Sequence, residues 1–454
     1  MRDKMKNKPK RVFLITVDCL RADFVGCING KAGFTPNIDR LAKDSVVFTR
    51  AFANGPGTRQ SFPAILTSTY FLMYAGMRLL PRYTTLAEVL SDNGFTTVAF
   101  HSNPFLSKAL GWGRGFSEFY DFMETLTGPS AFITRLQDTS SLSKLIRSIS
   151  TVLRANYNPV IQRLLKNVYY RFSRLQVPYL EGEKLNEYVT RWVEKNRCEK
   201  FFLWMHYMDP HCPYVPPDKY LLDFSSRGEA FNFNLSVDYE KPSRDEVEKL
   251  RNLYAGEVRY VDVCIGEFLE FLDDRALLDD SLILLMADHG HAFMEHGRFA
   301  HAYDIVYNEV LHVPLVVYGL NVDKKIDFPV QLLDVPPTIL EMVGIEKPKG
   351  FIGNSLIPLV RGIENSRPIF SESAKPDLVN LRHDTSRRVI SCINGEWKLI
   401  TNELWGTTEL YNIKKDFQEK INLVESESVI RKELKLLTRK HLLYEKSCRL
   451  KIKN

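Results

Sequence analysis

Residues 11–18, RVFLITVD, decide the fold class together with residues 281–288, SLILLMAD. Each is a nearly continuous run of apolar residues that ends in an aspartate, and similar runs occur at 96–100, 200–207 and 313–318. Segments of helical character separate these runs. Such runs are typical of parallel strands that helices cover on both faces of a sheet. The sequence therefore predicts an α/β fold with a mostly parallel central sheet flanked by helices.

The composition is that of an ordinary globular protein. The chain has 454 residues, of which 44% are hydrophobic and 26% charged, and this length predicts one large domain with a smaller one appended. The net charge of +6 favours anionic substrates but is far below the charge of a typical nucleic-acid-binding domain. We therefore expect an anionic substrate or an acidic surface, and no nucleic acid, as the partner.

The cysteines and the N-terminus bear on the cellular compartment. The seven cysteines are scattered and include no C-x-x-C pair, so neither a disulfide framework nor a zinc knuckle is expected. The basic residues 1–10 lead straight into the first apolar run, without the apolar core of a signal peptide. No apolar stretch reaches the length of about 18 residues that spans a bilayer. These features predict a cytoplasmic protein.

The chain divides into three parts by pattern. We predict a catalytic domain at 10–370, with a helical insertion at about 125–197, and a small C-terminal subdomain at 371–454. In the C-terminal part, short strand-like runs precede a charged helix at 424–445, which predicts an antiparallel sheet closed by a helix. The insertion is basic and amphipathic. It either packs on the α/β body with a solvated basic face or forms a lid that contacts a lipid headgroup or a polyanionic substrate at a membrane periphery.

Polar residues follow two of the predicted strands. Asp18 ends the first run, and Asp288 and His289 end the run at 281–288. Ligands bind at the carboxyl ends of strands in sheets of this kind, so these side chains are expected to converge. Two buried carboxylates and an imidazole suit a divalent cation. The alternative is a helix-capping aspartate beside a hydrogen-bonded histidine.

The third candidate element is the loop at 54–68, NGPGTRQSFPAILTS. Its Gly/Pro-rich start and apolar end predict a turn that leads into a helix N-terminus, where free N–H groups and the helix dipole favour a tetrahedral oxyanion. Thr58 and Ser61 supply hydroxyls there, and Arg59 supplies a positive charge. The alternative is an ordinary loop-to-helix cap.

Several segments in order along the chain resemble the landmarks of the sulfatase family of the alkaline phosphatase superfamily. They are 15–27 (ITVDCLRADFVGC), 34–53 (FTPNIDRLAKDSVVFTRAFA), 201–217 (FFLWMHYMDPHCPYVPP), 284–319 (LLMADHGHAFMEHGRFAHAYDIVYNEVLHVPLVVYG), 332–345 (LLDVPPTILEMVGI), 352–362 (IGNSLIPLVRG) and 409–423 (ELYNIKKDFQEKINL). The resemblance covers roughly 10–420 except the insertion. It implies an alkaline-phosphatase-like fold and a metal-dependent ester hydrolase or transferase.

The resemblance also implies roles for individual residues. Asp18, Thr58, Asp288 and His289 fall on positions that hold one divalent metal ion, such as Ca²⁺, Mn²⁺, Zn²⁺ or Mg²⁺. His211 falls on the histidine that contacts the reacting group or the leaving-group oxygen, and His301 on a position that touches the sulfuryl or phosphoryl oxygens. Arg59 is expected to hold substrate oxygens. His206 is interpreted as a buried structural residue. His291, His296 and Glu295 could also bind metal, but we interpret them as internal hydrogen-bonding residues of their loop.

Two departures from the family pattern affect the chemistry. Thr58 stands at the position where sulfatases convert Cys or Ser to formylglycine, and threonine is not expected to undergo that conversion. Threonine is the nucleophile in related branches, namely phosphodiesterases of the nucleotide-pyrophosphatase type, phosphoethanolamine transferases and lipoteichoic-acid synthases. A shift of three residues would place Ser61 there instead. Cys19 replaces the second aspartate of the usual pair, which removes a hard oxygen ligand.

Three functions follow from these observations. The first is a phosphoester hydrolase or phosphotransferase that acts through Thr58. The second is a sulfuric ester hydrolase that uses an unmodified hydroxyl. The third is a non-catalytic sulfatase-like protein that binds an anionic glycan or lipid headgroup, although the presence of Asp18, Asp288, His289 and His211 together argues against it.

Overall fold

The computed structural model describes residues 8–30, 33–74, 78–123, 177, 179–197, 199–363, 367–377 and 382–450. Most of the predicted basic insertion, residues 125–176, lies outside the described residues. Its last part forms helix α8 (Gly182–Asn196), which packs against strands of the central sheet. None of the helices in the described ranges is both long and apolar enough to cross a membrane.

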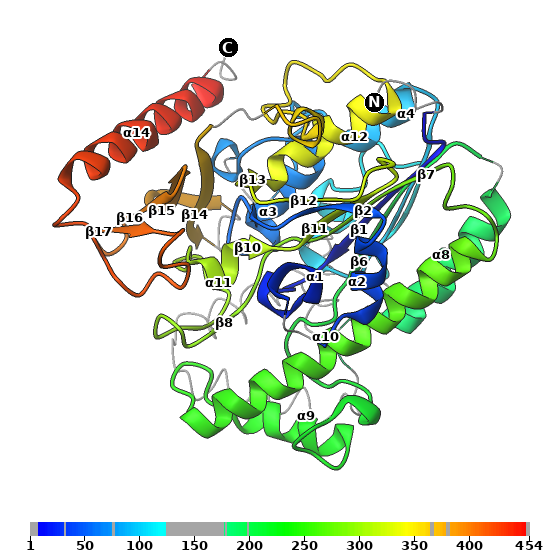
Figure 1. Ribbon diagram of the computed structural model, residues 1–454, viewed down its shortest axis with the longest axis horizontal. Helices are drawn as coiled ribbons and strands as arrows, with labels where there is room; N and C mark the ends of the chain where they lie inside the picture. The colour runs from blue at the N-terminus through cyan, green and yellow to red at the C-terminus, as the bar shows by residue number, and fades with distance from the viewer. Residues whose placement is uncertain are drawn as a thin grey trace, which may run out of the picture.

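The central sheet has eight strands in the order β12-β2-β11-β7-β1-β6-β4-β5 (Figure 1). The innermost strand β1 is parallel to both β6 and β7, whereas β11 is antiparallel to both of its neighbours. The predicted mostly parallel α/β sheet is therefore confirmed. Its strands are β1 (Arg11–Val17), β2 (Ser45–Phe48), β4 (Thr96–Phe100), β5 (Glu118–Tyr120), β6 (Phe201–Tyr207), β7 (Ser281–Ala287), β11 (Leu315–Tyr318) and β12 (Lys324–Ile326).

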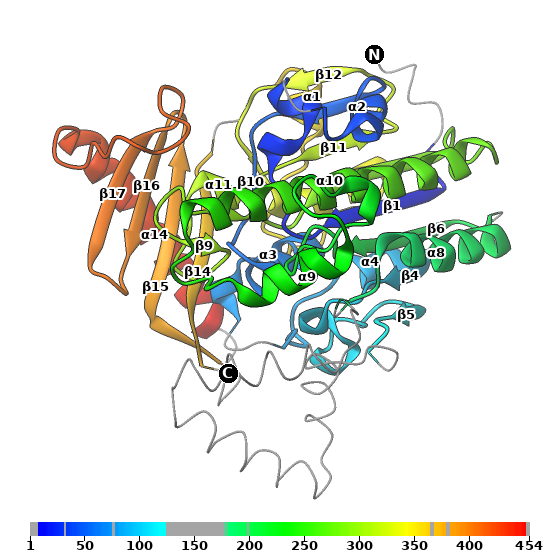
Figure 2. The ribbon, with the colours of Figure 1, turned by 90° about the horizontal axis from the view of Figure 1, so that it is seen from below.

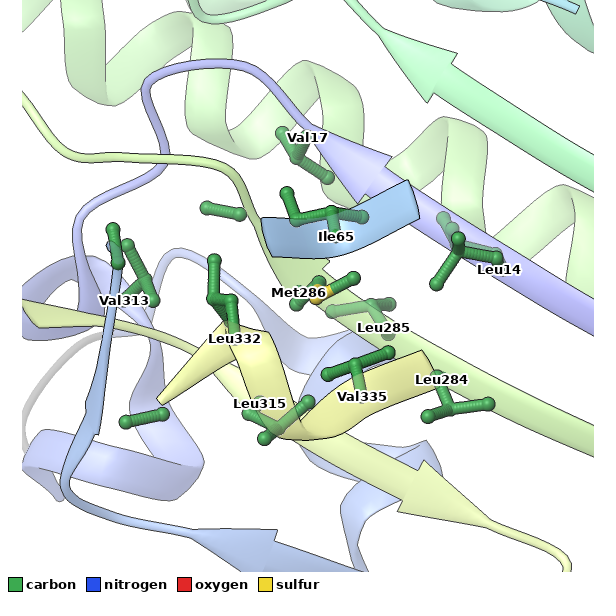
Figure 3. Packing of buried hydrophobic residues seen from close by; sticks show 14 of the residues in the cluster. Leu14, Val17, Ile65, Leu284, Leu285, Met286, Val313, Leu315, Leu332 and Val335 are labelled. Carbon is green, nitrogen blue, oxygen red and sulfur yellow. The ribbon is translucent and has the colours of Figure 1, made fainter. Parts of the chain in front are cut away.

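Helices cover both faces of this sheet, which is why its central strands β1, β6 and β7 are largely apolar and buried. Helices α8 and α10 (Arg244–Asp273) lie on one face, and α3 (Thr58–Thr67), α4 (Leu86–Asp92) and α12 (Val335–Val343) on the other (Figures 1 and 2). Alternate residues of a strand face opposite helices. The β1 residue Phe13 packs edge-on against Phe268 of α10, with ring centroids 5.6 Å apart. Its neighbour Leu14 belongs to the cluster in Figure 3 that includes Ile65 of α3.

Shorter elements surround this core. The other α-helices among the described residues of the catalytic part are α1 (Gly26–Asn29), α2 (Pro36–Ala42), α9 (Arg227–Ser236), α11 (Asn308–Leu311) and α13 (Ile357–Val360). Single 3-10 turns occur at Ala22–Phe24, Phe71–Met73, Pro104–Leu106, Lys108–Leu110, Asp218–Tyr220 and Leu332–Asp334. Small sheets join β10 (His312–Val313), β3 (Ala51–Phe52) and β13 (Val330–Gln331), and β8 (Ala292–Phe293) with β9 (Phe299–Ala300).

The C-terminal part forms a separate antiparallel sheet with a helix packed on it, as predicted (Figure 1). Its strands are β14 (Ile369–Asp377), β15 (Arg382–Asn394), β16 (Trp397–Asn402) and β17 (Thr407–Asn412), and its helix is α14 (Ser428–Leu450). The helix begins later than the predicted residue 424. The backbone N–H of Leu423 donates to the carbonyl of Leu410 in β17 at 2.7 Å, which holds the preceding segment against the sheet.

Candidate active site

The ends of adjacent strands bring the first candidate residues together. β1 and β7 are parallel and in register, with Val17 opposite Ala287, so Asp18 and Asp288 follow at the same edge of the sheet. Both carboxylates are fully buried. Thr58 is the first residue of α3, whose N-terminus reaches the same edge. The convergence of Asp18, Asp288 and His289 predicted from the sequence is thus present in the structure.

Each aspartate has one oxygen held by the protein and one that is not. Asp288 Oδ1 accepts the backbone N–H groups of His289 at 2.9 Å and of Cys19 at 3.4 Å. Asp18 Oδ2 accepts a hydrogen bond from Asn103 Nδ2 at 3.0 Å. Asp288 Oδ2 and Asp18 Oδ1 are buried and have no hydrogen-bond partner among the described residues. Buried carboxylate oxygens without partners are costly unless a cation binds them.

His289 and Thr58 face the same point as these two oxygens. His289 Nδ1 lies 2.9 Å from the carbonyl of Gly290, which leaves Nε2 to face the centre. This Nε2 atom lies 3.5 Å from both Asp18 Oδ1 and Asp288 Oδ2. Thr58 Oγ1 lies 3.5 Å from the same nitrogen. Ligand atoms around one cation with bonds of about 2.1–2.4 Å are roughly 3–3.5 Å apart, so the four residues fit a single divalent ion.

Two residues of this site were missed or misassigned from the sequence. His206, interpreted as structural, lies in β6 with its Nε2 3.3 Å from Asp18 Oδ2 and its Nδ1 2.8 Å from Thr16 Oγ1. Asn103, which follows β4, also approaches Thr58 Oγ1 to 3.4 Å. Both hold the same oxygen of Asp18, which leaves the other oxygen facing the centre. A polar cluster after the run at 96–100 was the sequence signal for Asn103.

The two carboxyl groups have opposite pKa shifts. Burial disfavours the charged form of Asp18, but the imidazoles of His211, His206 and His289 outweigh it and hold the pKa of Asp18 well below its usual range. Burial and the negative charge of Asp18 raise the pKa of Asp288 to about 8. The raised pKa of Asp288 means that a second negative charge at this site is not compensated by the protein, and a bound cation would compensate it.

The two histidines nearer the surface also differ. Burial favours the neutral form of His211, yet Cys212 and Asp18 beside it raise its pKa to about 10. Burial, together with His289 and His211, lowers the pKa of His301 well below its ordinary value. At neutral pH His211 is therefore the charged imidazole and His301 the neutral one. Their ring centroids are 5.3 Å apart.

A cavity of about 310 Å³ opens above these residues. Thr58, Arg59, His211 and His301 all line it, so each of the predicted catalytic residues faces the same space. The Arg59 guanidinium lies 4.5 Å from the centre of the Phe105 ring, and burial lowers its pKa. The remaining lining residues are Pro56, Gly57, Gln60, Asn103, Pro104, Phe105, Tyr179, Met208, Ala302 and Tyr303.

The other candidates from the sequence are engaged elsewhere. Ser61 is fully buried, and its hydroxyl donates to the carbonyl of Gly55 at 2.8 Å, so Thr58 is the better-placed hydroxyl. His291 Nε2 lies 2.7 Å from the Tyr214 hydroxyl, and His296 Nδ1 lies 2.7 Å from Glu309. Glu295 pairs with Arg21. These contacts agree with the structural roles expected for His291, His296 and Glu295.

Sequence comparisons show the family of this chain. The profile of the sulfatase family matches residues 10–345, and that of the C-terminal region of N-sulphoglucosamine sulphohydrolase matches residues 294–446. Human iduronate 2-sulfatase is 26% identical over 363 residues, which are 68% of this chain and 59% of that protein.

Solved structures have the same fold. A putative sulfatase from Bacteroides thetaiotaomicron superposes with a TM-score of 0.69 and 18% identity, over 98% of this chain and 96% of that one. The phosphonate monoester hydrolase of Agrobacterium radiobacter gives a TM-score of 0.67 and 17% identity, over 97% and 96% of the two chains. The profile match over residues 10–345 shows that the chain belongs to the sulfatase family, which is part of the alkaline phosphatase superfamily. The chain spans about 59% of the length of the human relative that it matches.

Proposed function

We propose that this chain is a metal-dependent ester hydrolase or phosphotransferase in which the Thr58 hydroxyl attacks a phosphoester. One observation carries the proposal. The Thr58 hydroxyl lies at the N-terminus of α3, 3.4 Å from Asp18 Oδ2 and 3.5 Å from His289 Nε2. It also lines the cavity. A nucleophile is thus adjacent to the metal ligands and to a space for substrate.

Asp18, Asp288, His289 and Thr58 would hold one divalent cation. When bound, such an ion lowers the pKa of a coordinated hydroxyl and polarises the oxygens of an ester. The protein contributes the orientation of the hydroxyl, because Thr58 is fixed in the first turn of α3. The positive end of the α3 dipole at this turn favours negative charge on the equatorial oxygens.

His211 is suited to the departure of the leaving group. Its pKa of about 10 keeps it protonated at neutral pH, so it donates a proton to the ester oxygen as that oxygen leaves. Thr58, as the alkoxide, gains the bond to phosphorus that the leaving oxygen loses. Water, or the hydroxyl of an acceptor in a transferase, then gives a proton to His211 and displaces Thr58 from phosphorus, which restores both groups. The neutral His301 and the cation Arg59 flank the cavity and contact the substrate oxygens.

Sulfate esters are the second candidate substrates. The human relative is by name a sulfatase, and the Agrobacterium protein is by name a phosphonate monoester hydrolase, so both chemistries occur on this fold. We favour phosphoesters because threonine replaces the residue that becomes formylglycine in sulfatases. A glycan or a lipid headgroup that carries an anionic ester fits the same cavity chemistry. A protein that only binds anions would not need Thr58 beside the carboxylates.

Two variants of Thr58 test the proposal. Thr58→Ala should lower turnover by orders of magnitude and leave the fold intact, because the hydroxyl is the nucleophile. Thr58→Ser should keep appreciable activity, because it loses only a methyl group. The assay is hydrolysis of aryl phosphate, phosphodiester, phosphonate and sulfate esters with defined divalent metals, and wild-type protein should favour the phosphoryl substrates.

Mass spectrometry of the peptide that contains residues 54–68 gives a direct readout, since a slow substrate should leave a phosphoryl group on Thr58. Ser61→Ala is the matched control. The Ser61 hydroxyl bonds the Gly55 carbonyl, so this variant should still form the adduct on Thr58. Full activity of Thr58→Ala, or an adduct on Ser61, would show that the nucleophile is wrongly assigned.

A further inference from the structure

Cys19 has neighbours that its position in the family pattern does not explain. The side chain is fully buried at the edge of the sheet, yet its Sγ lies 3.5 Å from His301 Nδ1 and 3.8 Å from His289 Nδ1. Ligand atoms of Cys19, His211 and His301 all lie within 4.8 Å of one another. Cys19 also lies within the same distance of ligand atoms of Asp18 and His289, so this group adjoins the carboxylate centre. Thiolate and imidazole are the ligands that Zn²⁺ prefers over Ca²⁺ or Mg²⁺.

We propose that Cys19, His211 and His301 form a second, sulfur-containing metal position beside the carboxylate centre, suited to Zn²⁺. The proposal rests on the proposed function, since it adds an ion to the same active site. In this proposal, the cysteine at position 19 replaces a hard oxygen ligand of the family pattern with a soft sulfur ligand. The sulfur lies on the other side of His289 from the carboxylate centre.

Distances within the group support a tetrahedral ion. In zinc sites the Zn–S bond is about 2.3 Å and the Zn–N bond about 2.0–2.1 Å, so sulfur and nitrogen on one tetrahedral ion are about 3.5 Å apart. The Sγ–Nδ1 separation of Cys19 and His301 is 3.5 Å. The same separation fits a thiol proton shared with the imidazole. A proton and an ion are thus alternative occupants of this position.

The orientation of His211 is the second support. Its Nδ1 lies 2.6 Å from the carbonyl of Cys212, which fixes the ring and leaves Nε2 as the ligand atom. A metal-binding histidine commonly has its other ring nitrogen held in this way. Both His211 and His301 line the cavity, so three protein ligands would leave the fourth coordination position open to substrate.

The position also fits the chemistry of the site. In the absence of an ion, the proton on His211 supplies positive charge where the leaving oxygen departs. A cation at the same place would supply that charge without a proton, and its binding would release the protons of the Cys19 thiol and of His211. Two cations on either side of the reacting group stabilise both the attacking and the leaving oxygen.

Titration of the full chain with Co²⁺ tests the proposal, because a thiolate ligand gives a sulfur-to-cobalt charge-transfer absorption that carboxylate and imidazole ligands do not give. Wild-type protein stripped of metal should bind two equivalents of Co²⁺ by elemental analysis, and one of them should produce the charge-transfer band. Cys19→Ser should bind one equivalent and lose the band. Cys27→Ser, which changes a buried thiol elsewhere, and Cys212→Ser should both keep two equivalents and the band.

The outcomes separate this proposal from the proposed function. One equivalent without a charge-transfer band, abolished by Asp288→Ala, would overturn the second position and leave the carboxylate centre intact. A band that persists in Cys19→Ser, or that disappears in Cys212→Ser instead, would also overturn it. Binding that is absent altogether would contradict both. His301→Ala removes a ligand from a different segment and should lose the same equivalent, which keeps the test decisive if Cys19→Ser does not fold.

Discussion

Asp18 and Asp288 carry the same chemical group, but their surroundings shift their pKa values in opposite directions. Three imidazoles lie near Asp18, and they keep it ionised despite its burial. Asp288 lies next to the charge of Asp18, which helps to raise its pKa to about 8. A bound cation needs both groups as carboxylates. A proton on Asp288 therefore competes with the metal.

This competition predicts the pH dependence of metal binding. Below a pKa of about 8 each ion that binds must displace the proton of Asp288, so affinity should fall as pH falls. The expected change is about tenfold in Kd per pH unit between roughly pH 6 and 8, with a plateau above that range. Calorimetry with Mn²⁺ in buffers of different ionisation enthalpy measures both Kd and the protons released. A Kd that is constant from pH 6 to 8 would contradict the assignment of Asp288.

His206 should act as a positioning residue for Asp18. Its ring connects Thr16 Oγ1 to Asp18 Oδ2 and so fixes which oxygen faces the metal. Loss of such an outer contact commonly costs about 10–100-fold in metal affinity. We therefore expect His206→Asn to weaken metal binding by that factor in calorimetry.

The matched control is His291→Asn, since His291 is equally buried but bonds Tyr214. It should keep wild-type affinity. A purely structural role of His206 would instead lower the unfolding temperatures of both variants alike and leave the two metal affinities equal.

The residues that the sequence did not reveal have a common reason. Every residue of β6 is buried, because helices cover both faces of the sheet, so the alternation that distinguishes a functional side from a core side is missing. His206 therefore looked like any other core residue. Asp18, Asp288 and His289 were predictable because they follow the last apolar residue of a strand.

The loop that precedes α3 is under a tight steric constraint at Gly55. A Cβ atom on Gly55 would lie 2.2 Å from Gln60 Cβ and 3.0 Å from the carbonyl oxygen of Glu372, so no side chain fits without a backbone shift. At Gly57 the nearest atom would be the flexible end of Gln60, at 3.0 Å. The backbone at Gly57 is extended, which any residue adopts. The glycine at 55, and not the one that caps the helix, thus sets the path of the loop.

The two glycines form a matched pair for a test. Gly55→Ala should move the start of α3 and with it Thr58, and a shift of about 1 Å in a catalytic group costs on the order of 100-fold in turnover. Gly57→Ala should cost much less, because only the Gln60 side chain must rotate. Phosphoester hydrolysis at saturating metal measures the effect, and circular dichroism checks the fold. Equal losses in both variants would show that the loop path does not depend on Gly55.

The sequence predicted the positions of the strands along the chain better than their direction and pairing in the sheet. Each of the five apolar runs contains a strand of the central sheet, although Val313 belongs to β10 of a small sheet. The antiparallel direction of β11 was not predicted, because a buried strand has the same composition in either direction. The small C-terminal sheet was recognised from its short runs, but β14 was not separately identified.

In the whole molecule, a buried ion pair inside the C-terminal part contacts the catalytic part through Asn308. Lys398 of β16 lies 2.8 Å from Glu419, and both side chains are fully buried. Lys398 Nζ also donates to Asn308 Oδ1 at 2.9 Å, and the Asn308 N–H donates to Glu419 at 2.6 Å. Asn308 begins α11, close in sequence to His301 of the active site. Burial lowers the pKa of Lys398 and raises that of Glu419, so the pair depends on their mutual contact.

The removal of one partner should therefore be more harmful than the removal of both. Lys398→Met leaves the Glu419 carboxyl buried without its cation, and such a change costs about 3–5 kcal/mol. The double variant Lys398→Met/Glu419→Gln removes both charges and should recover much of that loss. The exposed pair of Lys414 and Glu396 is the control, and Lys414→Met should change the urea midpoint little, since solvent screens the pair. Urea unfolding followed by circular dichroism measures all three variants. If Lys398→Met unfolds at the same urea concentration as Lys414→Met, the ion pair does not hold the C-terminal sheet in place, and its docking must depend on the apolar contacts of the sheet instead.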